Sequence, residues 1–433
     1  MRLRLLISTA LALGTACAGT VAPPGRPVAT VGAPKPAPSP SASSTSSGSS
    51  GVGPTASATP APSATFAWPT PTPADRAFTL EKPVSFAPGL GTPKQRAIAK
   101  HTRFGGASGD LRTFVIGVDQ HGALITPGAP AGVSFPAHSI QDDGARFSPD
   151  GARVAVLQYL GPLQVLSATD GARVWARADG AECDARFVDD GHVVFHAMSK
   201  ESAARLWTVD LATGIAAASG VPVAVDACTG APDAGRWLLY VDFEDGAPAG
   251  VIRVRDAASG AVLELVRGLA STWALSPTAD RACWVDPKAR EVVCRRATDG
   301  GRERILGGID AQGLEIDPLG ARMLIGAAKP GSDGEPEAVM YLVDFAAATV
   351  RRLNGVGLHT GGTLHLLAGG HLVAAGGADG VEVFDVDAGK RTVAKRTPFY
   401  SVHPLPGEAR RFVAGSEPGS GGSLEDVYLV EVP

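Results

Sequence analysis

The chain has 433 residues, of which 44% are hydrophobic and 19% charged, and its 54 glycines and 34 prolines indicate a globular part joined to a low-complexity part. The first 73 residues hold four of the 39 basic residues and no Asp or Glu, so the remainder carries 35 basic against 43 acidic residues, a net charge near -8. This balance argues against electrostatic binding to nucleic acid or to anionic lipid.

Residues 1–18 have the pattern of a secretory signal peptide. Two arginines precede an apolar run at residues 5–13, which is too short to span a bilayer, and small residues follow. Residues 13–17 resemble a bacterial lipoprotein box, which implies that Cys17 is lipidated. Cleavage after Ala18, giving a freely secreted protein, is the alternative.

Residues 19–75 consist almost entirely of Pro, Ser, Thr, Ala and Gly. A segment with so few large apolar side chains cannot offset its ordering entropy, so we expect a disordered linker. A lipid anchor at Cys17 would explain such a tether. An O-glycosylated or unimportant spacer on a secreted protein is the other interpretation.

A repeat of roughly 40 residues follows, built on a Pro-Asp-Gly turn and an apolar run. The clearest copy contains Phe147-Ser148-Pro149-Asp150-Gly151. The other copies are more degenerate and occupy residues 109–116, 187–195, 232–240, 275–284, 316–325, 369–373 and 406–413.

A second turn lies between these copies, where a strand ends in Asp and Gly follows a few residues later, as at Asp210 to Gly214. Each repeat therefore holds about four short strands, the pattern of a β-propeller blade. We predict an all-β fold for residues 76–433, a single propeller of four-stranded blades. Eight blades are predicted, with seven as the alternative, and two packed β-sandwiches are a further alternative. Pairing Ala77–Leu80 with the final strand at 426–432 would close the ring.

The segment Phe147-Ser148-Pro149-Asp150-Gly151, with echoes at Ser276-Pro277 and Asp317-Pro318, resembles the repeat of TolB-like and WD40-like propellers of bacterial envelopes. The resemblance covers residues 76–433 and implies a fold and a compartment. Residues 166–175 are similar to the repeat of quinoprotein-type propellers, which include eight-bladed outer-membrane lipoproteins. In that family a Trp docks between blades, and Trp175 stands at this place.

Four cysteines remain beside Cys17. A hairpin that pairs Asp286 with Glu291 places Cys283 opposite Cys294, which predicts a disulfide. A second bridge, Cys183 to Cys228, would join adjacent blades, and two free buried thiols are the alternative.

Linear motifs of nucleophilic, zinc-dependent or phosphate-binding enzymes are absent from the sequence. We therefore predict no catalytic, cofactor-binding or metal-ligating residue and no cofactor. The Asp-x-Asp segment at Asp385 and Asp387 is interpreted as a hairpin turn and not as a calcium loop. His365 and His403 fall near inner strands and are candidates to line the central channel.

Two functional hypotheses remain. The first is a non-enzymatic, monomeric binding or scaffold module for a protein or glycan partner, held at the outer membrane or cell surface of a bacterium by its lipid alone. The second is a hydrolase, lyase or quinone-dependent enzyme whose catalytic residues are dispersed over several blades. The fold by itself does not choose between them.

Overall fold

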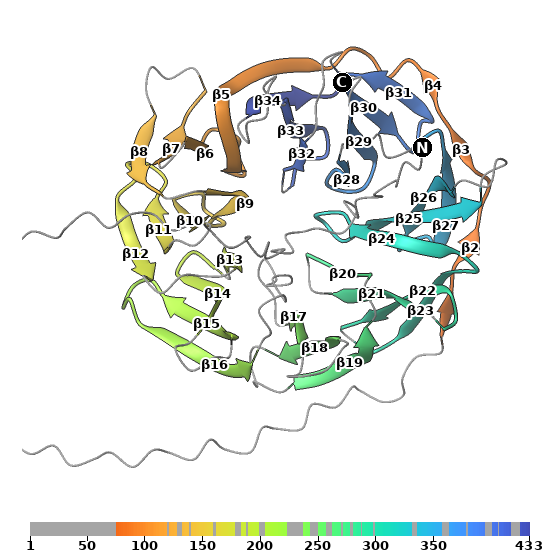
Figure 1. Ribbon diagram of the computed structural model, residues 1–433, viewed down its shortest axis with the longest axis horizontal. Helices are drawn as coiled ribbons and strands as arrows, with labels where there is room; N and C mark the ends of the chain where they lie inside the picture. Colours follow the sequence, from red (N-terminus) through yellow and green to blue (C-terminus); the bar gives the residue numbers. More distant parts are fainter. Residues whose placement is uncertain are drawn as a thin grey trace, which may run out of the picture.

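The computed structural model describes residues 75–118, 121–127, 132–137, 140–158, 162–177, 183–187, 189–198, 204–222, 237–242, 250–256, 262–269, 272–277, 280–286, 288–297, 299–330, 336–356, 363–377, 380–394, 401–405, 407–416 and 425–433. Within these ranges the regular elements are β-strands, which confirms the predicted all-β class. The sheets stand side by side around a central axis (Figure 1). Among the described residues there is no helix long and apolar enough to cross a membrane.

Three sheets are formed by strands that follow one another in the chain. The strands are β9 (Ile140–Phe147), β10 (Arg153–Gln158), β11 (Leu163–Ser167) and β12 (Arg173–Arg177); β13 (Cys183–Phe187), β14 (His192–Met198), β15 (Ala204–Asp210) and β16 (Ala216–Pro222); and β17 (Trp237–Asp242), β18 (Gly250–Asp256) and β19 (Val262–Leu269). In the first of these sheets the middle strands β10 and β11 are buried at most positions, because neighbouring sheets cover both faces.

Three more sheets have the same order but gain short strands on their outer edges. Their own strands are β20 (Trp273–Leu275), β21 (Arg281–Asp286), β22 (Glu291–Arg296) and β23 (Arg302–Gly307); β24 (Asp310–Ile316), β25 (Arg322–Pro330), β26 (Pro336–Asp344) and β27 (Thr349–Asn354); and β28 (Leu364–Leu366), β29 (Leu372–Gly377), β30 (Gly380–Asp385) and β31 (Lys390–Val393). The added strands are β1 (Arg76–Ala77), β2 (Thr79–Leu80), β3 (Val84–Ser85) and β4 (Ala87–Pro88).

The seventh sheet joins the two ends of the folded chain. It contains β5 (Lys94–Ala107), β6 (Phe114–Val118), β7 (His121–Ile125), β8 (Val133–Pro136), β32 (Ser401–Pro404), β33 (Arg411–Ser416) and β34 (Glu425–Glu431). The first part of β5 pairs with the final strand β34, and its last part pairs with β6. At the crossing, His101 has a φ of 51° and its amide donates to Asp426 Oδ1 at 3.1 Å.

The predicted partner of the final strand was wrong. Ala77 pairs with Arg304 of β23, and Leu80 pairs with Val350 of β27, whereas β34 pairs with β5. A four-residue segment offers too few backbone hydrogen bonds to compete with the long strand β5 for that edge. The count of eight blades stays a prediction, because the sheet of β17–β19 has only three strands among the described residues.

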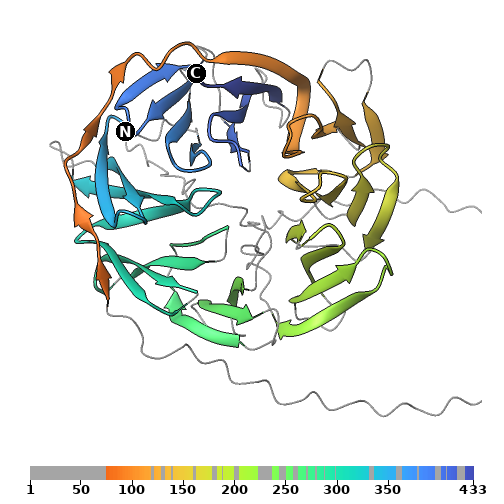
Figure 2. The same cartoon turned by 180° about the vertical axis from the view of Figure 1, so that it is seen from behind.

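The segment 76–90, which we call the strap, runs outside the ring and pairs in parallel with the outer strands β23, β27 and β31 (Figures 1 and 2). Its partly buried side chains face the ring, and they include Phe78 and Phe86. Phe78 lies edge-on against Phe345, with ring centroids 6.2 Å apart, and Phe86 lies 5.0 Å from Phe384. The strap therefore both covers edge strands and fills gaps between sheets.

In the sheet of β9–β12, which the strap does not reach, a side chain of the sheet itself fills the corresponding gap. Trp175 of β12 lies 5.5 Å from the Phe195 ring of the next sheet and packs on the buried cluster that contains Leu211. Leu211 follows the turn residue Asp210, as Phe345 follows Asp344 beside Phe78. Phe78 of the strap thus fills the gap beside the sheet of β20–β23 that corresponds to the gap filled by Trp175 beside the sheet of β9–β12.

One face of the ring carries the six pairs of turns whose connecting bonds are given below, and we call it the turn face. The turn between the first two strands is joined to the turn between the last two by a recurring backbone hydrogen bond, which fixes both turns. This bond runs from Ala168 N to Ala152 O, Leu211 N to Gly191 O, Ala297 N to Asp280 O, Phe345 N to Ala321 O, Val386 N to His371 O and Val432 N to Arg410 O.

Ala348 is expected to be a strained residue of the turn face. It has a φ of 55° where the matching turns have Gly214, Gly300 and Gly389, and a side chain in this conformation costs about 1 kcal/mol or more. Ala348→Gly should therefore raise the free energy of unfolding by about 1 kcal/mol, measured by chemical denaturation. Ala347→Gly, one residue earlier and without a positive φ, should lower it by about 0.5 kcal/mol or more. Equal changes in the free energy of unfolding of the two variants would show that Ala348 is not strained.

Candidate functional site

The predicted pairing of Cys283 with Cys294 is present. The two residues face each other in the β21–β22 ladder, and a disulfide joins them. Both are fully buried in the cluster that links this sheet to the next one, so the bridge is a structural element of the core.

The other predicted cysteine sites are not brought together by the described residues. Cys183 begins β13, opposite His196, while Cys228 lies outside the described residues. Their bridge stays a prediction. Cys17, the predicted lipidation site, also lies outside the described residues.

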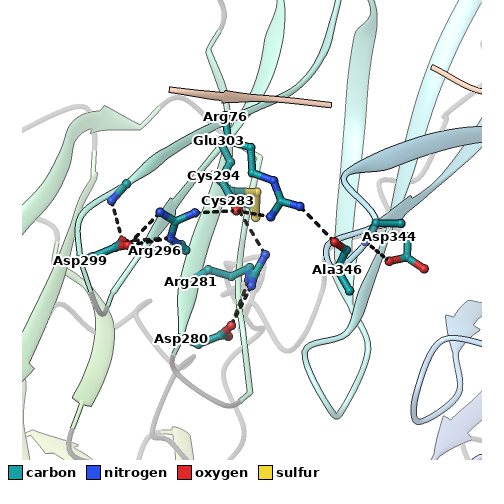
Figure 3. A network of polar contacts seen from close by, with 12 residues as sticks. Arg76, Asp280, Arg281, Cys283, Cys294, Arg296, Asp299, Glu303, Asp344 and Ala346 are labelled. Atoms are coloured by element: carbon teal, nitrogen blue, oxygen red, sulfur yellow. Dashed lines mark hydrogen bonds and ion pairs between the residues drawn. A yellow bond between two sulfur atoms is a disulfide. The ribbon is translucent and has the colours of Figure 1, made fainter. Parts of the chain in front are cut away.

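A buried charge network lies beside the disulfide, centred on Glu303 of β23 (Figure 3). The Glu303 side chain has no exposed surface. Its carboxylate lies 3.2 Å from a guanidinium nitrogen of Arg281, 3.3 Å from one of Arg296 and 3.6 Å from one of Arg76. Asp280 and Asp299 bind the outer sides of Arg281 and Arg296, so these two guanidinium groups are neutralised from both sides.

Arg76 links this network to the strap. Besides facing Glu303, its guanidinium donates to the carbonyl oxygen of Ala346 at 3.1 Å and lies over the Phe78 ring. Every charge in the network has a partner and the central carboxylate is shielded from solvent, so we interpret it as the fastening of the strap and not as a reaction centre.

The two histidines proposed for the channel lie on the first strands of their sheets, β28 and β32. His365 Nδ1 is 3.1 Å from Glu315 Oε1 on β24, and the same oxygen accepts the Leu366 amide at 3.2 Å. His403 is only 7% exposed, and its ring lies 5.0 Å from that of Phe104. His365 contacts a neighbouring sheet, whereas His403 contacts β5 of its own sheet, and the role of both in lining the channel stays a prediction.

The turn face has a hollow of about 320 Å³ at the junction of the sheet β28–β31 with the sheet that contains β32–β34. Its lining combines small and apolar side chains with charged ones. Its lining consists of His371, Leu372, Asp385, Asp387, Ala388, Ala409 and Arg410.

Asp387 is the most connected side chain of the hollow. Arg322, from the preceding sheet, donates to its two oxygens at 3.0 and 3.1 Å, and His371 Nδ1 lies 2.5 Å from Oδ2. Arg351 adds a guanidinium at 3.6 Å. Burial raises the pKa of Asp387, but the hydrogen bonds from His371 and Arg322 outweigh it and hold the pKa below its ordinary value, so this carboxylate is anionic at neutral pH.

Asp385 and Arg410 are the second pair of opposite charges in the lining. Asp385 Oδ1 accepts the amides of Asp387 and Ala388, at 3.1 and 2.8 Å, as the predicted hairpin turn requires. Its other oxygen lies 3.9 Å from Arg410 Nη2, and the Arg410 side chain is half exposed. The hollow thus presents a fixed carboxylate and an accessible guanidinium side by side, which can bind hydrogen-bond donors and acceptors of a ligand, respectively.

No three His, Cys, Asp or Glu side chains gather at metal-binding distance within the described part of the chain. Sequence reasoning missed the roles of Arg322, Arg410 and Asp387 in one hollow. The Arg322 to Asp387 contact joins residues 65 positions apart, so only the repeat alignment, which puts Arg322 directly after one turn and Asp387 inside another, carried a signal of it.

No family model and no curated protein matches the sequence. Among solved structures, the Dos1 propeller is similar with a TM-score of 0.53 at 13% identity over 78% of this chain and 94% of that one. BamB from Moraxella catarrhalis has a TM-score of 0.50 at 13% identity, over 78% and 98%. An oligogalacturonate lyase from Vibrio parahaemolyticus has a TM-score of 0.50 at 10% identity, over 79% and 98%. The chain folds as a β-propeller.

At these identities the likeness concerns the propeller fold alone, and it extends both to a lyase and to propellers whose names state no reaction. The resemblance of the repeat to TolB-like propellers stays a prediction. Any function must therefore be argued from the hollow and from the segments that precede the ring.

Proposed function

We propose that this propeller is a binding module held at the bacterial cell envelope, with the hollow on the turn face as the contact for a protein or glycan partner. The observation that carries the proposal is the hollow itself. Its carboxylates are fixed by Arg322, His371 and the turn amides before any ligand arrives, and such preorganisation lowers the entropy cost of binding.

The segments that precede the ring support the proposed location at the cell envelope. A signal peptide, a lipoprotein-like Cys17 and a Pro- and Ser-rich linker are the parts of a membrane tether, and the strap joins such a tether to the outer rim of the ring. The folded part carries excess negative charge, so we propose that it is a monomer that meets the membrane only through its lipid.

Arg410→Glu tests the binding site. Retention of the purified chain on washed bacterial envelopes should fall at least tenfold, because the accessible guanidinium is replaced by a carboxylate beside Asp385. Arg173→Glu makes the same charge change at an exposed position of β12, in another sheet, and should leave retention unchanged. Equal retention of the wild type and both variants would overturn the role of the hollow.

Cys17→Ala tests the tether. Expressed in a bacterial host, the wild type should carry a diacylglyceryl mass and partition into detergent, and the variant should lose both properties. An unmodified wild-type mass that starts at Gly19 would overturn the lipid anchor and leave a secreted protein.

A further inference from the structure

The ligand class of the hollow follows from the groups that are still open to a ligand. Asp385 Oδ2 and Arg410 Nη2 are 3.9 Å apart, which is longer than a hydrogen bond. Asp385 Oδ1 is already bound to the two turn amides. Among the described residues the charged neighbour of Oδ2 is the Arg410 guanidinium, so an acceptor and a donor face each other across a gap.

A hydroxyl group fits this gap chemically. It can donate to the carboxylate and accept from the guanidinium at the same time, with its oxygen about 2.8 Å from each atom. A carboxylate or phosphate of a ligand would meet Arg410 but would be repelled by Asp385 and Asp387. A ligand cation would meet those carboxylates but would be repelled by Arg410.

Both carboxylates of the lining face guanidinium groups: Asp387 is paired with Arg322 and Arg351, and Asp385 faces Arg410. No unpaired charge of the lining therefore selects an ion. Leu372, Ala388 and Ala409 add apolar surface to the lining. A volume of about 320 Å³ is at the small end of ligand pockets and suits one ring.

We propose that the hollow binds a neutral sugar unit of a glycan, with one hydroxyl bridging Asp385 Oδ2 and Arg410 Nη2 and the C–H face of the ring over Ala388 and Ala409. This inference rests on the proposed function, because it names the chemistry of the partner at the same hollow. It favours a glycan over a protein partner.

The test is titration of the full mature chain with neutral hexoses and N-acetylhexosamines, followed by saturation-transfer NMR and calorimetry, beside the matching uronic acids. Asp385→Asn keeps the amide acceptor that caps the turn but removes the Oδ2 charge, and Arg410→Gln removes the guanidinium. Each variant should weaken binding of the neutral sugar at least tenfold. Arg391→Gln, at an exposed position of β31 outside the lining, should bind as the wild type does.

Thermal unfolding of each variant separates loss of the site from loss of the fold, and Arg410 is exposed enough that its variant should fold normally. Preference for uronic acids, or neutral-sugar binding that neither variant weakens, would overturn the inference. If no sugar binds but Arg410→Glu still lowers envelope retention, the proposed sugar ligand is wrong and the proposed binding role of the hollow stands. Absence of both effects would overturn both proposals.

Discussion

Replacing Glu303 by alanine is expected to lower the free energy of unfolding by about 3 kcal/mol. The carboxylate is fully buried and lies within 3.6 Å of the guanidinium groups of Arg76, Arg281 and Arg296. Its removal leaves these like charges facing one another with little solvent to screen them. Chemical denaturation of the purified variant and wild type measures the difference.

The matched control is Glu264→Ala on β19. Glu264 also pairs with an arginine, Arg267, at 2.6 Å, but both side chains are more than one third exposed. Exposed ion pairs contribute little, so this change should stay within about 0.5 kcal/mol. In the Glu303 variant, hydrogen exchange should also rise at Phe78 and Thr79, whose amides bind Arg304 and Ala348. Similar losses in the two variants would show that burial of Glu303 is unimportant.

The second large effect is expected from the strap. The double variant Phe78→Ala, Phe86→Ala should lose about 3 kcal/mol of the free energy of unfolding, because each partly buried ring packs on an aromatic ring of the propeller, Phe345 or Phe384. A loosened strap would also expose the outer edges of β23 and β31, which can then pair with other chains. Denaturation and size-exclusion chromatography measure the two consequences.

Leu80→Ala is the control within the strap. Leu80 is a large apolar residue of β2 that remains 60% exposed, so truncating it removes little buried surface. Its variant should unfold within about 0.5 kcal/mol of the wild type and stay monomeric. Unchanged stability in the double variant would mean that the strap does not hold the ring together.

The turns of the propeller could be predicted from the sequence because each is a local arrangement. At Ser148-Pro149-Asp150-Gly151 the Gly151 amide donates to Ser148 O at 2.8 Å, and Gly151 has a φ of 71°, as a glycine at this place predicts. The Cys283 to Cys294 register followed from the same logic, since the hairpin at Asp286 and Glu291 fixes every pair along the ladder.

The strap could not be predicted in this way. Phe78 and Leu80 lie only two residues apart, yet Phe78 packs between sheets and Leu80 is exposed. Parallel pairings of two residues leave no alternating pattern in the sequence. A glutamate such as Glu303 is expected on the exposed side of a strand, and only the assembled network shows that it is buried.

By itself, the sequence determined the all-β class, the repeated turns and one disulfide, because a turn or a hairpin is set by residues close together in the chain. The tertiary structure alone decided that β5 pairs with β34, that the strap covers three edges and that the hollow gathers its charges. The physical reason is distance along the chain: Arg76 reaches Ala346 across 270 residues and Arg322 reaches Asp387 across 65. Such contacts form only when the sheets close into a ring.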